Sequence, residues 1–212
     1  MTSGSMFSRN RLYPKAPEPN GDVSAVKGNC SDEQKQLNLN TLAFFAGIGE
    51  PSVFGYHVAA NLKLVEMNVN RICISGSSAE ASGEESVKAI QGHTICEIEV
   101  QTGMLSRHGT LAGACLVHLL DITTFTALFT VGFATESDPT GASTAMDIRW
   151  HASALPGTIL SIHSTTLNYK GRTVSSRAEV YDRRKGTLIA SAVHTVAPLA
   201  SFKDTAARKA KL

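Results

Sequence analysis

The stretch that decides the fold runs from Arg107 to Thr130 and reads RHGTLAGACLVHLLDITTFTALFT. From Leu111 onward its apolar residues have helical spacing, leucine and alanine are frequent and proline is absent, which predicts a helix over about 111–130. A helix that is apolar on most sides must be covered by the rest of the fold. Asp121 is the only acidic residue in that helix. Burying an unpaired carboxylate costs several kcal/mol, so its position needs a reason.

Two interpretations of Asp121 follow from the residues alone. In the first, the helix breaks and Asp121 caps a second segment by accepting a hydrogen bond from the amide of Thr123 or Thr124. In the second, Asp121 is a general base beside a ligand cleft and takes a proton from water. His118, one turn earlier, is spaced to hydrogen-bond this carboxylate. Gly113 supports the second interpretation, because unpaired amides at a helix start can approach a polarised carbonyl and form an oxyanion hole.

Composition places the chain among soluble globular proteins with one sizeable domain. It has 212 residues, of which 42% are hydrophobic and 18% are charged. The formal net charge of +2 does not mark a nucleic-acid or membrane-surface binder, and no apolar run is as long as the roughly 20 residues that span a bilayer. The four cysteines lack the spacing of metal ligands or of a redox pair, so we expect free thiols and no metal site.

The rest of the chain predicts an α+β domain over 31–200. Residues 1–30, rich in proline and polar residues, predict a disordered N-terminal arm, and 201–212 form a basic tail. Ser31 and Gln34 have capping-box spacing and predict a helix over 31–46. A polar loop is expected at 76–91. Six strands are expected, over 62–75, 94–100, 142–152, 158–169, 172–182 and 187–197. Short turns between the last four favour an antiparallel meander, with the sheet wrapped around the central helix.

Three stretches together resemble the hotdog-fold acyl-CoA thioesterases, in particular the small single-domain group that includes phenylacetate-pathway thioesterases. They are SRHGTLAGACLVHLLD (106–121), GASTAMDIRWHASALPGT (141–158) and NYKGRTVSSRAEVYDRRKGTLIASAVHT (168–195). The likeness extends from about residue 63 to residue 199. It implies a hotdog fold, with a long central helix wrapped by an antiparallel sheet of about six strands. It also implies hydrolysis of acyl-CoA to a free acid and coenzyme A.

The resemblance assigns roles to residues of this sequence. Asp121 is implied to activate water, and the amide of Gly113 to bind the thioester oxygen. Ser143 matches a serine that positions the water or the thioester, and His194 matches a family histidine near the end of the last strand. The chain departs from the family pattern at two places. Ala112-Gly113-Ala114 stands where His-Gly-Gly is usual, and Ser106 replaces an asparagine but keeps a hydrogen-bonding hydroxyl. His108 is a nearby histidine that could compensate, and a surface histidine next to Arg107 is at least as good an interpretation of this residue.

Coenzyme A is implied as part of the substrate, and no separate cofactor is expected. The turn Lys170-Gly171-Arg172-Thr173 offers cations and amides for its phosphates, as the corresponding turn does in similar enzymes. Without the resemblance, this stretch would be an ordinary charged hairpin turn. Trp150 and His151 are expected to flank the nucleotide, although an aromatic residue at such a place also serves simple packing.

The spacing of Gly113 and Asp121 predicts a dimer. Eight residues along a straight helix separate them by about 12 Å, too far for both to touch one thioester. If both act, two subunits share each site, and a symmetric interface then makes two sites. The resemblance likewise implies a homodimer or a dimer of dimers.

Alternatives remain open at this point. Ala112 and Ser106 are also compatible with a non-catalytic acyl-CoA binding or scaffolding hotdog protein. A hotdog hydratase is disfavoured, because by resemblance it needs a histidine where Thr126 stands. The final tripeptide, residues 210–212, reads Ala-Lys-Leu and resembles the peroxisomal Ser-Lys-Leu signal. It predicts recognition by a peroxisomal import receptor and a peroxisomal location, with cytoplasm or mitochondrion as alternatives.

Overall fold

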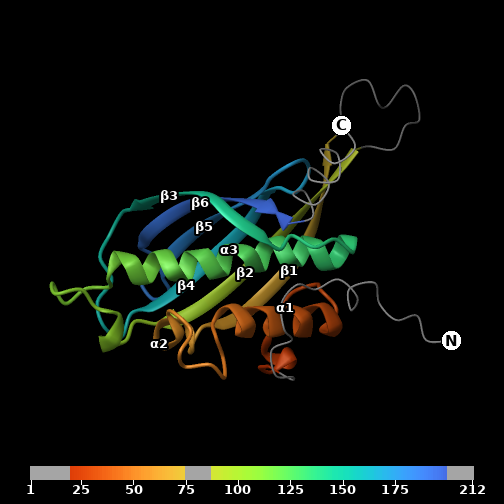
Figure 1. The fold of residues 1–212 in the computed structure, drawn as a ribbon. Helices are drawn as coiled ribbons and strands as arrows, with labels where there is room; N and C mark the ends of the chain where they lie inside the picture. The colour runs from red at the N-terminus through yellow and green to blue at the C-terminus, as the bar shows by residue number, and fades with distance from the viewer. Residues whose placement is uncertain (1–19, 75–86, 200–212) are drawn as a thin grey trace, which may run out of the picture.

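The computed structural model describes residues 20–74 and 87–199. Its centre is one long helix, α3, Gly113–Thr135, which lies across one face of a six-stranded antiparallel sheet (Figure 1). The strand order is β1-β2-β4-β5-β6-β3. The strands are β1 Lys63–Ile74, β2 Val87–Glu99, β3 Gly141–Trp150, β4 Ile159–Asn168, β5 Val174–Asp182 and β6 Leu188–Pro198. This arrangement confirms the predicted hotdog fold.

α3 is the core of the domain. Its side chains pack against β2, β4 and β5 on one side and against α1, Asp32–Phe45, on the other. By length and composition α3 is long and apolar enough to cross a membrane, so the expectation that no apolar stretch reaches this length was wrong. In this fold, however, 72% of its most apolar window is buried inside the protein. The sheet and α1 therefore supply the apolar surroundings that such a helix requires.

Buried threonines of this apolar helix make hydrogen bonds within the helix itself. The hydroxyls of Thr123, Thr124 and Thr130 each donate to the carbonyl four residues earlier, at 2.7–2.9 Å. Their donors are thus satisfied inside the core, where an unmade hydrogen bond would be costly. The low helix propensity of these residues is offset by packing, and α3 continues without a break from Gly113 to Thr135.

Strand pairing differs from the predicted four-strand meander. β4, β5 and β6 do form consecutive antiparallel pairs, but β3 pairs with β6 and lies at the sheet edge. β4 instead pairs with β2, so the chain from β3 to β4 crosses the domain rather than making a hairpin. The Pro156-Gly157 signal indicated a turn correctly. A turn signal alone does not say which strand lies next to which.

The N-terminal boundary also differs from the prediction. Residues 20–30, expected to be part of a disordered arm, are structured: they include a short 3-10 helix at Val23–Ala25, and Lys27 pairs with Glu66 of β1. Gly28, with φ 108°, passes so close to β1 that a side chain there would overlap the carbonyl of Met67. The contacts with β1 thus offset the entropy of ordering a polar segment. Residues 1–19 lie outside the described residues.

The other boundaries agree with the prediction to within two residues, except that β2 begins at Val87 rather than at 94 and α3 ends at Thr135 rather than at 130. α1 has the predicted capping box, in which the Ser31 hydroxyl accepts from the amide of Gln34 and the Gln34 side chain accepts from the amide of Ser31. The loop expected at 76–91 is too long, because 87–91 already belong to β2. Residues 75–86 of that loop, and the tail with its C-terminal tripeptide, lie outside the described residues.

Candidate active site

Asp121 lies in the middle of α3, and the helix does not end there, so the capping interpretation is wrong. The carboxylate is also not buried within one chain, because its side chain is 49% exposed. The second half of α3 is almost fully covered, whereas Ala114 and Val117 in the first half are exposed on the same side as Asp121. The expected burial of the carboxylate therefore fails for a single chain. Asp121 lies on an uncovered strip of an otherwise buried helix.

A β-bulge brings Ser143 to Asp121. Ser143 lies opposite Val196 of β6 and Ala145 opposite Thr195, so Thr144 is an extra residue in β3. The insertion shifts the alternation of side chains, and Ser143 consequently points to the helix side of the sheet. Its hydroxyl donates to Oδ1 of Asp121 at 3.2 Å. The predicted pair of Asp121 and Ser143 is thus brought together by the sheet edge.

His194 of β6 is the third residue of this group, with Asp121 and Ser143, which we call the Asp121 cluster. The side chain is fully buried, its Nδ1 is 2.7 Å from Oγ1 of Thr124, and its Nε2 is 3.7 Å from Oδ1 of Asp121. Burial lowers the pKa of His194, and the nearby Asp121 carboxylate opposes this only in part. The imidazole is therefore uncharged at neutral pH and does not form an ion pair with Asp121. Nε2 makes no hydrogen bond to the described residues.

The proton on His194 is assigned from its partners. Thr124 has one hydroxyl proton and directs it to the carbonyl of Leu120 at 2.7 Å. Its oxygen then accepts from Nδ1 of His194, so Nδ1 carries the ring proton and Nε2 presents a lone pair toward Asp121.

A second group of predicted residues gathers at the start of α3. Gly113 is the first helical residue, and Ala112 before it supplies no side-chain cap, so the N-cap residue leaves the first amides of the helix uncapped. The indole of Trp150 lies beside Gly113, 3.7 Å from the point where a Cβ would stand. Trp150 and His151 line a pocket of about 290 Å³ at this helix start. The rest of its lining is Thr110, Leu111, Leu116, Ala152, Ser153, Ala154 and Ile189.

Ser106 and His108 belong to the turn that leads into α3. The amide of Ser106 donates to the carbonyl of Thr110, and its hydroxyl accepts from the amide of His108 at 3.2 Å. Ser106 therefore holds the turn, and the His108 side chain is exposed. His118 does not hydrogen-bond Asp121 as its spacing suggested. It packs edge-on against Phe54, with ring centroids 5.4 Å apart, and the backbone at Gly55 closes over its Nε2.

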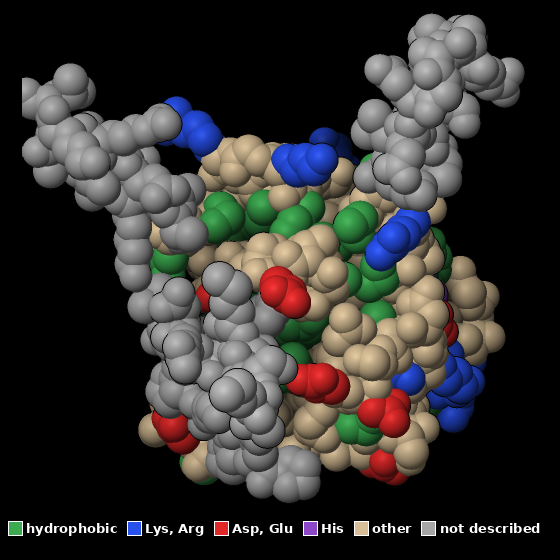
Figure 2. Space-filling view, turned by 90° about the vertical axis from the view of Figure 1, so that its right-hand side faces the viewer, with side chains coloured by type: hydrophobic (Ala, Val, Ile, Leu, Met, Phe, Trp, Pro, Cys, Tyr) green, Lys and Arg blue, Asp and Glu red, His purple; other side chains and the backbone are tan. Residues whose placement is uncertain are grey.

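The turn Lys170–Thr173 joins β4 to β5 at the end of the molecule where α3 finishes. The Tyr169 hydroxyl marks this end, because it accepts from Ser137, just after α3. Asn168 closes the turn by donating to the carbonyls of Lys170 and Thr173. Lys170 and Arg172 are exposed. Within the described ranges neither forms an ion pair. Figure 2 views this end, with Lys and Arg side chains along its upper edge and Asp and Glu below.

Within one chain the predicted site residues form two separate groups. Trp150 lies opposite Ala190 on β6, whereas Ser143 lies opposite Val196, so roughly 20 Å of strand separates them. The turn at 170–173 adjoins the Ser143 end, since Val174 also pairs with Val196. One chain thus presents a hydrogen-bond donor, the amide of Gly113, at the start of α3 and, about two helical turns further, the carboxylate of Asp121 at its middle.

The described residues contain no cluster of three or more histidine, cysteine or acidic side chains able to hold a metal ion. Cys30, Cys96 and Cys115, the cysteines whose side chains are described, are unpaired, in agreement with the predicted free thiols.

Comparison with known proteins shows similarity to thioesterases. Residues 108–189, from the turn before α3 to the start of β6, match the thioesterase superfamily. The resemblance to the hotdog thioesterases is confirmed. Two solved structures with the same fold are thioesterase superfamily member 2 of zebra fish and of Mus musculus. The zebra fish protein has 19% sequence identity and a TM-score of 0.54 over 75% of this chain and 96% of that one. For the mouse protein the values are 21% and 0.52 over 76% and 96%. No curated protein matches the chain.

Three features of this hotdog site were missed from the sequence. The bulge at Thr144 leaves no trace in a single sequence, since one extra residue in a strand looks like any other. The contact between His194 and Asp121 joins residues 73 positions apart, so spacing did not reveal it, although the resemblance had pointed to His194. The packing of Phe54 on His118 depends on where the loop before α2, Tyr56–Ala59, folds back.

Proposed function

We propose that this protein hydrolyses acyl-CoA thioesters to a free acid and coenzyme A, using water activated by Asp121. The observation that carries the proposal is the cluster on the uncovered strip of α3. There Asp121 accepts from Ser143 at 3.2 Å and faces the unpartnered Nε2 of the neutral His194 at 3.7 Å. A carboxylate that is open to substrate and backed by a buried lone pair suits a general base. The match of residues 108–189 to the thioesterase superfamily supports the same reaction class.

The reaction that this site supports is direct attack by water. Asp121 takes one proton from water while the water oxygen forms a bond to the thioester carbon, and the electron pair of the carbonyl moves onto its oxygen. The amide of Gly113 donates to that oxygen. When the tetrahedral intermediate collapses, the carbon–sulfur bond breaks, and the proton held by Asp121 passes to the departing sulfur. Ser143 orients the carboxylate, and Nε2 of His194 accepts a hydrogen bond from Asp121 while it is protonated.

We propose that two subunits share each site. Gly113 and Asp121 of one chain lie on one unbroken helix, about 12 Å apart, so a single thioester cannot contact both. A symmetric dimer in which the helix start of one chain faces the helix middle of the other brings the two groups together twice. The uncovered strip of α3 and the 56% exposed Trp150 support such a contact. The same arrangement allows the cations of the turn at Lys170 and Arg172 to lie near a nucleotide bound beside the partner's Trp150.

A turnover assay tests this proposal. Purified full-length protein is given acyl-CoAs of several chain lengths with a thiol-reactive dye, and a substrate-free sample corrects for the protein's own thiols. Asp121→Asn is expected to reduce turnover by at least the 10²–10⁴-fold that general-base catalysis typically contributes, with binding retained. Asp147→Asn is the matched control, because Asp147 is an exposed carboxylate on β3, the strand that carries Ser143, and its ion pair among the described residues is with Arg149, at 3.6 Å. Equal turnover by the two variants would refute the role of Asp121.

The second candidate is an acyl-CoA binding or scaffolding protein that has lost part of the site. The observation that favours it is the helix start, where Ala112 offers no side-chain donor and Ser106 uses its hydroxyl to hold its own turn. In the same assay, binding of acyl-CoA without turnover by the unmodified protein supports this candidate. Turnover that Asp121→Asn removes supports the enzyme.

A further inference from the structure

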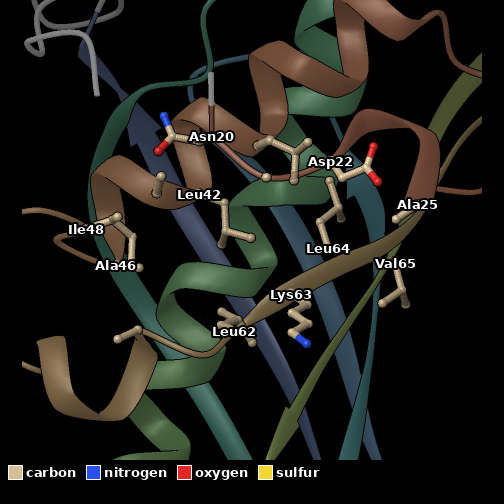
Figure 3. A pocket seen from close by; sticks show the side chains of 14 residues that line it. Asn20, Asp22, Ala25, Leu42, Ala46, Ile48, Leu62, Lys63, Leu64 and Val65 are labelled. Carbon is tan, nitrogen blue, oxygen red and sulfur yellow. The ribbon is translucent and has the colours of Figure 1, made fainter. Parts of the chain in front are cut away.

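A cavity of about 460 Å³, shown in Figure 3, shares no lining residue with the Asp121 cluster or with the pocket at the start of α3. It is formed between α1 and the start of β1, and the segment that begins at residue 20 closes one side. Its volume is within the range of small-molecule sites in proteins. Its lining consists of Asn20, Gly21, Asp22, Ala25, Leu39, Leu42, Ala43, Ala46, Ile48, Ala60, Leu62, Lys63, Leu64 and Val65.

The residues that line the cavity explain why it stays open. Where larger side chains would fill the space between α1 and β1, the chain has Ala43, Ala46 and Ala60. Ala43 is 7% exposed, yet it is not part of the contiguous apolar core that surrounds α3. Empty apolar space costs packing energy, so a well-packed core would normally close it. A ligand with an apolar body would make the contacts that are lacking.

Among the described residues that line this cavity, Lys63 carries the positive charge. Its backbone begins β1, its side chain is exposed, and in Figure 3 its ammonium lies at the opposite edge of the cavity from Asn20 and Asp22. Among the described residues no carboxylate lies within ion-pair distance of it. Glu97, directly across on β2, is instead held by Arg183 at 2.9 Å. Within the described ranges the lysine is therefore not ion-paired, and it lies between this cavity and a neighbouring groove that Glu97, Glu99 and Arg183 also line.

The polar groups at the other edge are already engaged. The carboxylate of Asp22 accepts from the amide and the hydroxyl of Ser24, at 2.9 and 2.7 Å, and these hydrogen bonds hold the pKa of Asp22 below its ordinary value. Asn20 hydrogen-bonds Asn40. Because Asp22 is negatively charged, an anion is favoured at the Lys63 edge and disfavoured at the Asp22 edge. The cavity thus has a positively charged edge at Lys63 and a negatively charged edge at Asp22. Between these edges it is apolar, along Leu42, Leu62 and Leu64 (Figure 3).

We propose that this cavity is a second ligand site, which binds an aliphatic carboxylate with its tail between α1 and β1 and its carboxylate on Lys63. The site shares no lining residue with the pocket at Trp150 and none with the Asp121 cluster. It therefore goes beyond the proposed hydrolysis and does not depend on it. A fatty acid has the required chemistry: an apolar chain for the alanine- and leucine-lined space and one negative end for the unpaired lysine.

The test measures binding to the full-length protein by isothermal titration calorimetry, with dodecanoate and the uncharged dodecan-1-ol as probes. Lys63→Met is expected to weaken dodecanoate about five-fold, the effect of losing one partly exposed ion pair, and to leave dodecan-1-ol unchanged. Ala43→Leu, which fills the cavity, is expected to weaken both probes at least ten-fold. Lys185→Met is the matched control, since Lys185 is an exposed lysine 3.8 Å from Asp182 in the β5–β6 turn.

Two results overturn the proposal. If Lys63→Met and Ala43→Leu both leave dodecanoate affinity unchanged, the probe binds elsewhere. If Ala43→Leu raises the KM for acyl-CoA by the same factor as it weakens dodecanoate, the cavity is the acyl channel of the hydrolytic site and not a second site. Thermal unfolding checks that the variants are folded, and Ala60→Leu, which fills the cavity from α2, decides the matter if Ala43→Leu does not fold. The affinity measurements do not require turnover, and only the comparison of KM values does.

Discussion

Replacing Gly113 by proline removes one backbone N–H and is expected to leave the fold unchanged. Gly113 is the first residue of α3, a position where proline is favoured because its missing N–H is not needed by the helix. Ala112 before it has φ −68° and ψ 134°, the extended conformation that the residue before a proline prefers. A Cβ at this position stands 3.7 Å from the Trp150 ring, an ordinary contact.

The expected magnitude follows from the role of that amide. Removing one oxyanion-hole donor costs about 2.7–4 kcal/mol in the transition state, so kcat should fall about 10²–10³-fold with little change in KM. Gly113→Ala is the matched control, because it adds the same Cβ but keeps the N–H, and its kcat should stay within a few-fold of the unmodified protein. Thermal unfolding of both variants should lie close to that of the unmodified protein.

Mixing variants tests whether the site is shared. Gly113→Pro chains and Asp121→Asn chains are each expected to be inactive alone. In a mixed dimer one site carries both defects and the other carries none, so an equal mixture should regain about a quarter of full activity. An inactive Gly113→Ala, or a fully active Gly113→Pro, would refute the donor role. No recovery on mixing, with mixed dimers demonstrated, would refute the shared site.

Three further predictions follow from other parts of the chain. Because burial lowers the pKa of His194, the unfolded chain binds this proton more readily, so stability should be lost as the pH falls below the ordinary histidine value of 6.5. Unfolding curves of His194→Gln should show a smaller loss. Arg172→Ala with Lys170→Ala should raise the KM for acyl-CoA, increasingly so at low salt, but not the KM for a thioester without phosphates. A fluorescent protein that carries residues 210–212 at its C-terminus should enter peroxisomes. The same fusion without Leu212 should stay in the cytoplasm.

Much of the fold was predictable because local patterns and packing agree. The capping box at Ser31, the apolar run of α3 and the turn signals of the last strands each predicted an element that exists. The order of strands was not predictable from turns, since the placement of β3 beside β6 depends on pairing across the whole domain. That residues 20–30 have a defined structure could not be predicted for a similar reason. Their own composition is polar, and the contacts that hold them come from β1.

The candidate site was predicted in its parts but not in its assembly. Asp121, Ser143 and Gly113 were singled out, and the structure brings the first two together. The burial expected of Asp121 was inferred from its neighbours along the helix, but the sheet and α1 leave one side of the first half of α3 uncovered. Whether a side chain faces a core or an open strip depends on the elements packed around the helix, which a helical pattern does not specify.

The extra residue at Thr144 lets β3 change length at one point. Ser143 lies opposite Val196 and Met146 lies opposite His194, and Val196 and His194 are both buried on the helix side of the sheet. Deleting Thr144 would therefore make the alternation of β3 regular and leave Ser143 opposite Val196, on the side of Asp121. The sheet edge can thus be shortened by one residue without displacing the hydroxyl that touches the carboxylate.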